Sequence, residues 1–238
     1  MIRKLFATPI AAAVAAVFVG AAAAHDVAIR PRFDLLALYA AYVIAVVTLE
    51  MRIAHAPSVG TGRWATAGLA AIALMAGSAL VTVLGWPALW IVLALALMAF
   101  AFVTGPRLSD TGLAGPVTIA VLGPLASSGA ALAVAGHVSP TAFWIGVPVG
   151  LLADAARRAR EAAASVALAA RAPHLSTEGS PPAPPWFAAD LISAFGGILV
   201  LVSLGTLPWP ALLALATLPW ALGEAARART GAYAWGEA

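Results

Sequence analysis

Apolar stretches of membrane-spanning length recur along the whole of this 238-residue chain, and they leave few folds open to it. A transmembrane helix needs about 20 mostly apolar residues and satisfies its own backbone hydrogen bonds in lipid. Only 10% of the residues are charged and 63% are hydrophobic, which is too little polar surface to cover a globule in water. The sequence therefore predicts an all-α, polytopic membrane helical bundle, built as a single transmembrane domain over residues 1–238.

Eight segments are long and apolar enough to be spans, and tryptophans lie at many of their edges, where an amphipathic ring prefers the headgroup region. The predicted spans are residues 5–24, 35–51, 64–84, 87–103, 115–135, 141–156, 186–205 and 209–223. The first segment has a basic start and small residues near its end, which is also typical of a secretory signal peptide. We predict a retained span there, and a cleaved signal is the alternative.

The positions of the basic residues indicate how the predicted spans are oriented. With the N-terminus inside, all of the 13 Lys and Arg residues except Arg30 and Arg32 fall on the inner side. This is the bias of the positive-inside rule. It predicts an integral protein of a bacterial-type inner membrane, with both termini inside and two longer inner-face loops at residues 50–63 and 157–185.

Several classes of function are excluded or disfavoured by composition. Cysteine is absent, which excludes disulfides, thiolate catalysis and Cys-ligated metals. The net charge is only +3, so the high pI does not indicate a nucleic-acid partner. A small transporter would need paired charges or broken helices near the membrane midplane, and the predicted spans hold almost no charges.

Short Gly- and Pro-containing motifs occur in order along the second half of the chain. They are TGP at residues 104–106, GLAG at 112–115, GP at 123–124, PVGLL at 148–152, and LPWPALLALATLPWAL at 207–222. In these motifs and in its span order, the chain resembles the UbiA superfamily of intramembrane prenyltransferases. The resemblance is strongest to the branch that prenylates dihydroxynaphthoate in menaquinone synthesis, and it implies a UbiA prenyltransferase-like bundle.

The resemblance also implies where a site would lie. In that family, aspartate motifs on the loops after spans 2 and 6 hold Mg²⁺, which bridges the carboxylates to a prenyl diphosphate. Here the first motif falls on Met51, Arg52 and His55, and the second on residues 160–164, with no aspartate in place. We therefore expect no cofactor and no Mg²⁺-dependent prenyl transfer. The expected partners are membrane lipids, an isoprenoid, quinone or pigment ligand, or another membrane protein.

The alternative is an active but diverged prenyltransferase. It would move a prenyl group from a prenyl diphosphate to an aromatic acceptor that resembles a quinone precursor, and Mg²⁺ would then be its cofactor. Catalytic residues are unknown under this interpretation, because no acid of the family pattern is in place.

Basic residues on the predicted inner face are the candidate binders of a phosphate or a lipid headgroup. They are Arg52, His55, Arg107, Arg157, Arg158 and Arg160. A guanidinium matches the geometry of a phosphate, which favours direct binding. The same residues also fit an inner face that contacts anionic headgroups, and this second interpretation stays open. The histidines and carboxylates of this face lack ligand spacing on one helix, so we predict no metal site.

Four further residues are candidates for the lining of a cavity: Tyr39, Tyr42, Glu50 and Asp154. The two tyrosines have an alternative role, in which the rings pack and each hydroxyl bonds to a neighbour. Asp154 also has an alternative role, an ion pair with Arg157 or Arg158, because these arginines follow it by one helical turn. Pro124, with its missing N–H, predicts either a kink that opens a central cavity or loose packing at a kink.

Overall fold

Helices make up nearly all of the described part of this computed structural model. The structure describes residues 8–25, 28, 30–55, 63–104, 114–151, 153–154, 186–209, 211–212 and 215. These residues contain no β-strand. The helices are α1 (Thr8–His25), α2 (Phe33–His55), α3 (Arg63–Leu84), α4 (Trp86–Thr104), α5 (Ala114–Ala120), η3 (Val121–Leu125), α6 (Ala126–Ala135) and α8 (Trp186–Ser203). A further apolar helix, Pro140–Leu151, lies between α6 and α8 in the chain.

Glycines mark the ends of two helices. The chain leaves α3 at Gly85 and α6 at Gly136, with φ of 74° and 77°. Residues with a side chain rarely adopt this left-handed backbone conformation, whereas glycine adopts it without a steric cost. At Gly136 the N–H donates to the Leu132 carbonyl at 2.8 Å, which satisfies one of the last carbonyls of α6. The short turn after Gly85 leads directly into α4, with Pro87 in its first turn.

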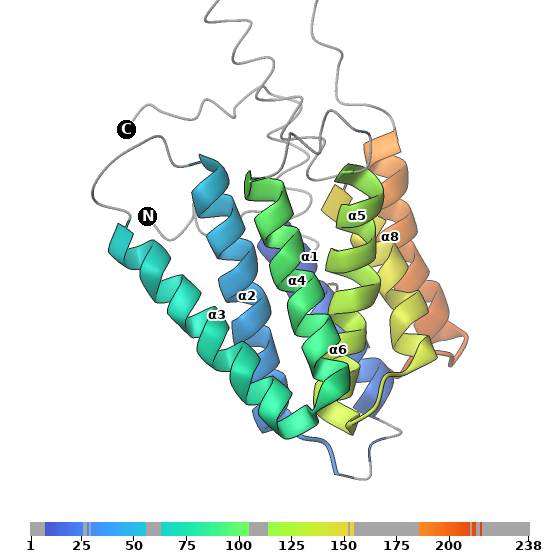
Figure 1. Cartoon of the computed structure of the whole chain (residues 1–238). Helices are drawn as coiled ribbons and strands as arrows, with labels where there is room; N and C mark the ends of the chain where they lie inside the picture. Colours follow the sequence, from blue (N-terminus) through green and yellow to red (C-terminus); the bar gives the residue numbers. More distant parts are fainter. Residues whose placement is uncertain are drawn as a thin grey trace, which may run out of the picture.

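The helices pack as neighbours of α2 and α6. α6 packs most extensively against α1 and also contacts α2, while α2 packs against α3 and α4 (Figure 1). α3 lies at the edge of the bundle and contacts mainly α2 and α4. The core is built mostly from alanine and valine, with several leucines and isoleucines and with Tyr39 and Tyr42 as its two aromatic members. Small residues let helix backbones approach closely in lipid, where there is no hydrophobic force between helices.

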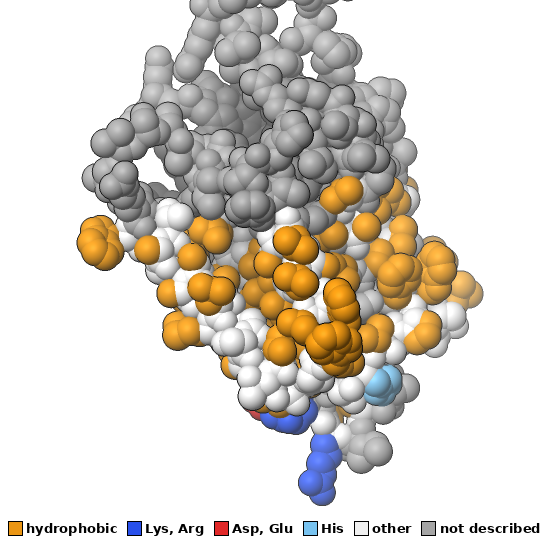
Figure 2. Space-filling model, viewed as in Figure 1, with side chains coloured by type: hydrophobic (Ala, Val, Ile, Leu, Met, Phe, Trp, Pro, Cys, Tyr) orange, Lys and Arg blue, Asp and Glu red, His pale blue; other side chains and the backbone are white. Residues whose placement is uncertain are grey.

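Three helices are long and apolar enough to cross a membrane. The stretches that qualify are Phe33–Glu50, Trp64–Leu84 and Val117–Ala135. Many hydrophobic side chains are also exposed on the face of the bundle that Figure 2 shows. Trp64 on α3 is 87% exposed and Trp86 on α4 is 67% exposed, which suits rings that contact lipid rather than water. The chain is thus a helical membrane protein.

Figure 2 shows lysine or arginine side chains at one end of the visible face of the bundle. The Arg32 guanidinium donates two hydrogen bonds to the Asp34 carboxylate, at 3.1 and 2.7 Å. This hydrogen bonding raises the pKa of Arg32 above its ordinary value. The backbone N–H of Arg32 donates to the Val134 carbonyl at 3.1 Å, which ties this end of α2 to the end of α6. An exposed ion pair contributes little stability, so the backbone bond is the more important anchor here.

The predicted helices largely match the observed ones, with one correction at the end of the second span. The prediction ended that span at residue 51 and assigned residues 50–63 to an inner-face loop. Instead, α2 continues to His55, and Glu50 lies inside the helix. The run from Glu50 to His55 contains no proline or glycine, so nothing local ends the helix where its apolar character ends. The loop at residues 157–185 and most of the predicted span 209–223 lie outside the described residues.

Candidate functional site

One face of α2 carries a stripe of buried valines that ends in an acid. Val43, Val46, Val47 and Glu50 are spaced i, i+3, i+4 and i+7, which places them on the same side of the helix. The valines are at most 6% exposed, and Glu50 is half-buried. The Glu50 side chain is therefore directed along the packed face of α2.

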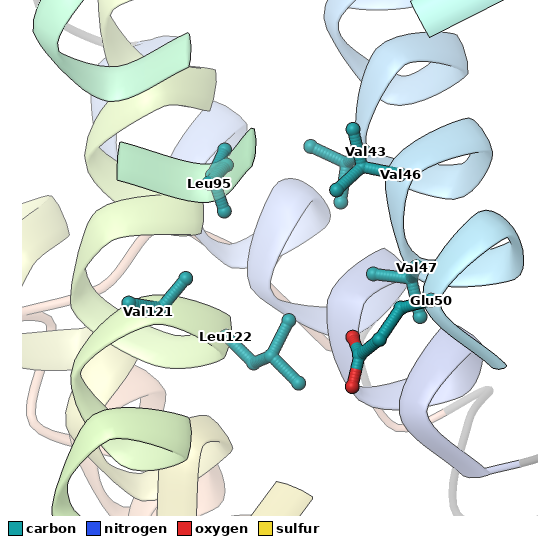
Figure 3. A pocket seen from close by; sticks show the side chains of 7 residues that line it. All are labelled: Val43, Val46, Val47, Glu50, Leu95, Val121 and Leu122. Carbon is teal, nitrogen blue, oxygen red and sulfur yellow. The ribbon is translucent and has the colours of Figure 1, made fainter. Parts of the chain in front are cut away.

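A small pocket lies between this stripe and two neighbouring helices. Across from α2, the pocket is lined by Leu95 of α4 and by Val121 and Leu122 of η3. Figure 3 shows the Glu50 carboxylate and the Leu122 side chain pointing toward one another across it. The cavity has a volume of about 10 Å³. Glu50 is the one ionisable residue among its described lining residues, and all the others are valine or leucine.

No protein-family model, curated protein or solved structure matches this chain. The likeness to intramembrane prenyltransferases therefore rests on the sequence motifs alone.

The chemistry of the pocket follows from a single carboxylate beside apolar walls. A carboxylate accepts hydrogen bonds through both oxygens and repels an anion, unless a cation lies between them. Among the residues that the structure describes, no three His, Asp or Glu side chains gather as a possible metal site. The described pocket thus offers a hydrogen-bond acceptor at one end and an apolar surface along the rest.

The side chains of all six candidate phosphate-binding residues lie outside the described part of the chain. Arg52 and His55 lie in the last two turns of α2, but their side chains are outside the described part of the chain. Arg107, Arg157, Arg158 and Arg160 lie outside the described residues altogether. Direct binding of phosphate or headgroups by these residues stays a prediction.

Both tyrosines of α2 are packed with their hydroxyls bonded to backbone carbonyls. The Tyr39 hydroxyl donates to the Ala126 carbonyl at 3.0 Å, and the Tyr42 hydroxyl donates to the Val92 carbonyl at 2.6 Å. Each ring is 2% exposed. These contacts correspond to the packing alternative, and neither tyrosine is among the described residues that line the Glu50 pocket.

Asp154 is buried at the end of the helix that begins at Pro140. It is 4% exposed and takes part in a polar interaction. The predicted pairing with Arg157 or Arg158 lies outside the described residues. Asp154 is also not among the described residues that line the Glu50 pocket.

A π-helix inside the predicted fifth span is the feature that sequence reasoning missed. Residues Val121–Leu125 form η3, and Pro124 lies within it. The N–H of Ala126 donates to the Val121 carbonyl, five residues earlier, which is the π-helical pattern. Gly123-Pro124 is the only local signal, because proline removes a donor from the helix interior. Val121 and Leu122 of this segment form one wall of the Glu50 pocket.

Proposed function

We propose that this chain is an eight-span, prenyltransferase-like membrane protein that binds an apolar ligand at the Glu50 pocket and does not carry out Mg²⁺-dependent prenyl transfer. The ligand is an isoprenoid, quinone or pigment whose head group donates a hydrogen bond, such as a prenyl alcohol or a reduced quinone. In this proposal both termini and Arg52 face the inside of a bacterial-type inner membrane, and Arg30 and Arg32 face outward.

The observation that carries the proposal is the position of Glu50. The carboxylate lies at the end of an apolar stripe and faces apolar side chains of two other elements. A carboxylate at this position favours a donor such as a hydroxyl, and it disfavours a free diphosphate by charge repulsion. It also stands one residue before the position where the resemblance places the first aspartate motif. The position of Glu50 therefore supports binding of an apolar chain that carries a hydroxyl head group.

A Glu50→Gln variant should bind a short prenyl alcohol more weakly than the unmodified chain. A hydrogen bond to a charged group contributes about 1.5–3 kcal/mol, and 1.4 kcal/mol corresponds to tenfold in affinity. Since glutamine keeps an acceptor oxygen, we expect a loss of about tenfold. The measurement is equilibrium binding of radiolabelled farnesol to the purified chain in lipid nanodiscs.

Asp34→Asn is the matched control, because it makes the same carboxylate-to-amide change on the same helix. Asp34 lies 16 residues before Glu50, or about 24 Å along α2, and pairs only with exposed Arg32 among the interactions given above. Its farnesol affinity should be unchanged. Farnesyl diphosphate binding that requires Mg²⁺, with release of diphosphate, would instead establish the diverged enzyme. No saturable binding of either probe would overturn the proposed function.

A further inference from the structure

The pocket beside Glu50 is small compared with the head groups of its candidate ligands. Its volume of about 10 Å³ has room for about one water molecule, which is close to the size of a hydroxyl group. An aromatic ring needs far more space, since an engineered apolar cavity that binds benzene measures about 150 Å³. The size of the pocket therefore bears on which head groups can reach the Glu50 carboxylate.

The spacing of α2 and α4 beside the pocket is held by a hydrogen bond. The Tyr42 hydroxyl of α2 donates to the Val92 carbonyl of α4 at 2.6 Å. Val43 follows Tyr42 directly, and Leu95 lies about one turn beyond Val92. Both side chains line the pocket, and each is at most 3% exposed. These two walls are thus packed in place.

The η3 wall is held by neighbours of its own. η3 contacts α1 and α4. A Cβ atom on Gly123, the residue after Leu122, would overlap the Gly146 carbonyl and the Gly150 backbone, so η3 also lies in backbone contact with the helix Pro140–Leu151. Leu122 itself is buried. A head group wider than the pocket would therefore have to displace packed side chains or helix backbones.

The atom that carries a hydroxyl affects how the hydroxyl can enter a pocket of this size. Primary alcohols and phenols both donate one O–H. In a primary alcohol, the oxygen ends a flexible chain whose last carbon is bonded to only one other carbon. In a phenol or hydroquinone, the oxygen is bonded to the ring itself, so two ring carbons flank it. The ring would meet Leu122, which faces the Glu50 carboxylate across the pocket (Figure 3).

We infer that the Glu50 pocket selects isoprenoid alcohols over ligands with a ring as head group, and that Leu122 is the residue that excludes the ring. This inference rests on the proposed function, because it concerns the same site. It narrows the ligand from isoprenoids, quinones and pigments to a prenyl chain that ends in a primary alcohol. The small volume and the Leu122 side chain opposite the carboxylate carry it.

The unmodified chain should bind farnesol at least tenfold more tightly than para-farnesylphenol. The two probes share one prenyl chain and one hydroxyl, and they differ in the ring. A phenol is the more acidic donor, so hydrogen-bond strength would favour the phenol, and weaker binding of the phenol reports the size of its head group. The measurement is competition of each probe with radiolabelled farnesol on the purified chain in lipid nanodiscs.

Leu122→Ala should raise the affinity for para-farnesylphenol at least tenfold, because it removes the side chain that meets the ring. Leu132→Ala is the matched control, since it makes the same change further along the same predicted span. Leu132 is buried in the core and is not among the described residues that line the pocket. This control should leave the affinity for the phenol unchanged. If Leu122→Ala does not fold, Leu122→Val should give a smaller gain in the same direction.

The outcomes separate this inference from the proposed function. Binding of para-farnesylphenol by the unmodified chain that is as tight as binding of farnesol would overturn the inference and leave the proposed function standing. An equal gain in phenol binding in Leu132→Ala, or no gain in either Leu122 variant, would overturn the role of Leu122. No saturable binding of either probe to the unmodified chain would overturn the proposed function and this inference together.

Discussion

Replacing Gly20 with alanine should strongly destabilise the bundle, because a single methyl group there has no space. The added Cβ would overlap the Ser127 carbonyl of α6, and neither can move aside, because the Cβ is attached directly to one helix backbone and the carbonyl belongs to another. Overpacking of this kind costs about 1–3 kcal/mol, and a backbone clash lies at the upper end of that range or above it. We expect a loss of about 3 kcal/mol in the free energy of unfolding, measured by SDS titration in mixed detergent micelles.

Gly68→Ala is the matched control, since Gly68 also lies inside a helix and a Cβ there would meet nothing within 4 Å. Alanine favours helix over glycine by about 0.8–1.0 kcal/mol, so this variant should be slightly more stable than the unmodified chain. If both variants changed stability by the same amount, the contact between α1 and α6 would not be the source of the effect.

Truncation of Tyr39 to alanine should produce the other large loss of stability. The ring is 2% exposed and packs between α2 and α6, where it fills the space beside Gly129. Removal of a buried aromatic side chain costs about 3–5 kcal/mol, mostly because a cavity remains. The same SDS titration measures this loss.

Tyr39→Phe separates the ring from the hydroxyl. It removes only the bond to the Ala126 carbonyl, and interhelical hydrogen bonds in a membrane contribute on average about 0.6 kcal/mol. The phenylalanine variant should therefore retain most of the stability that the alanine variant loses. A phenylalanine variant as unstable as the alanine variant would show that the hydroxyl, rather than ring packing, holds α6 to α2.

The helix positions were predictable from the sequence to within a few residues. Tryptophan and proline near the span edges indicated where α3, α4 and α8 begin, and these helices start at Arg63, Trp86 and Trp186. These signals are local, because a backbone in lipid has no other way to satisfy its hydrogen bonds. The second span was predicted to end at residue 51, and α2 continues to His55, since an apolar run can end before its helix does.

The candidate site was predictable only in part. Glu50 was identified as a candidate cavity residue from its place at the end of an apolar run. It was assigned to a loop, although its spacing from Val43, Val46 and Val47 continues the buried face of α2. That periodic signal was present in the sequence. Its partners Leu95, Val121 and Leu122 come from elements far along the chain, and no local pattern connects them to Glu50.

By itself, the sequence determined that this protein is a helical membrane bundle and where its main helices lie, since both follow from local apolar length and composition. Only the tertiary structure decided which small residues bring backbones together and that the fifth predicted span contains a π-helix. It also decided that Glu50 faces Leu122 across a small pocket. The physical reason is that a backbone in lipid must form its own hydrogen bonds, which makes helix formation a local property of the sequence. Close packing depends instead on which helices meet and at what depth.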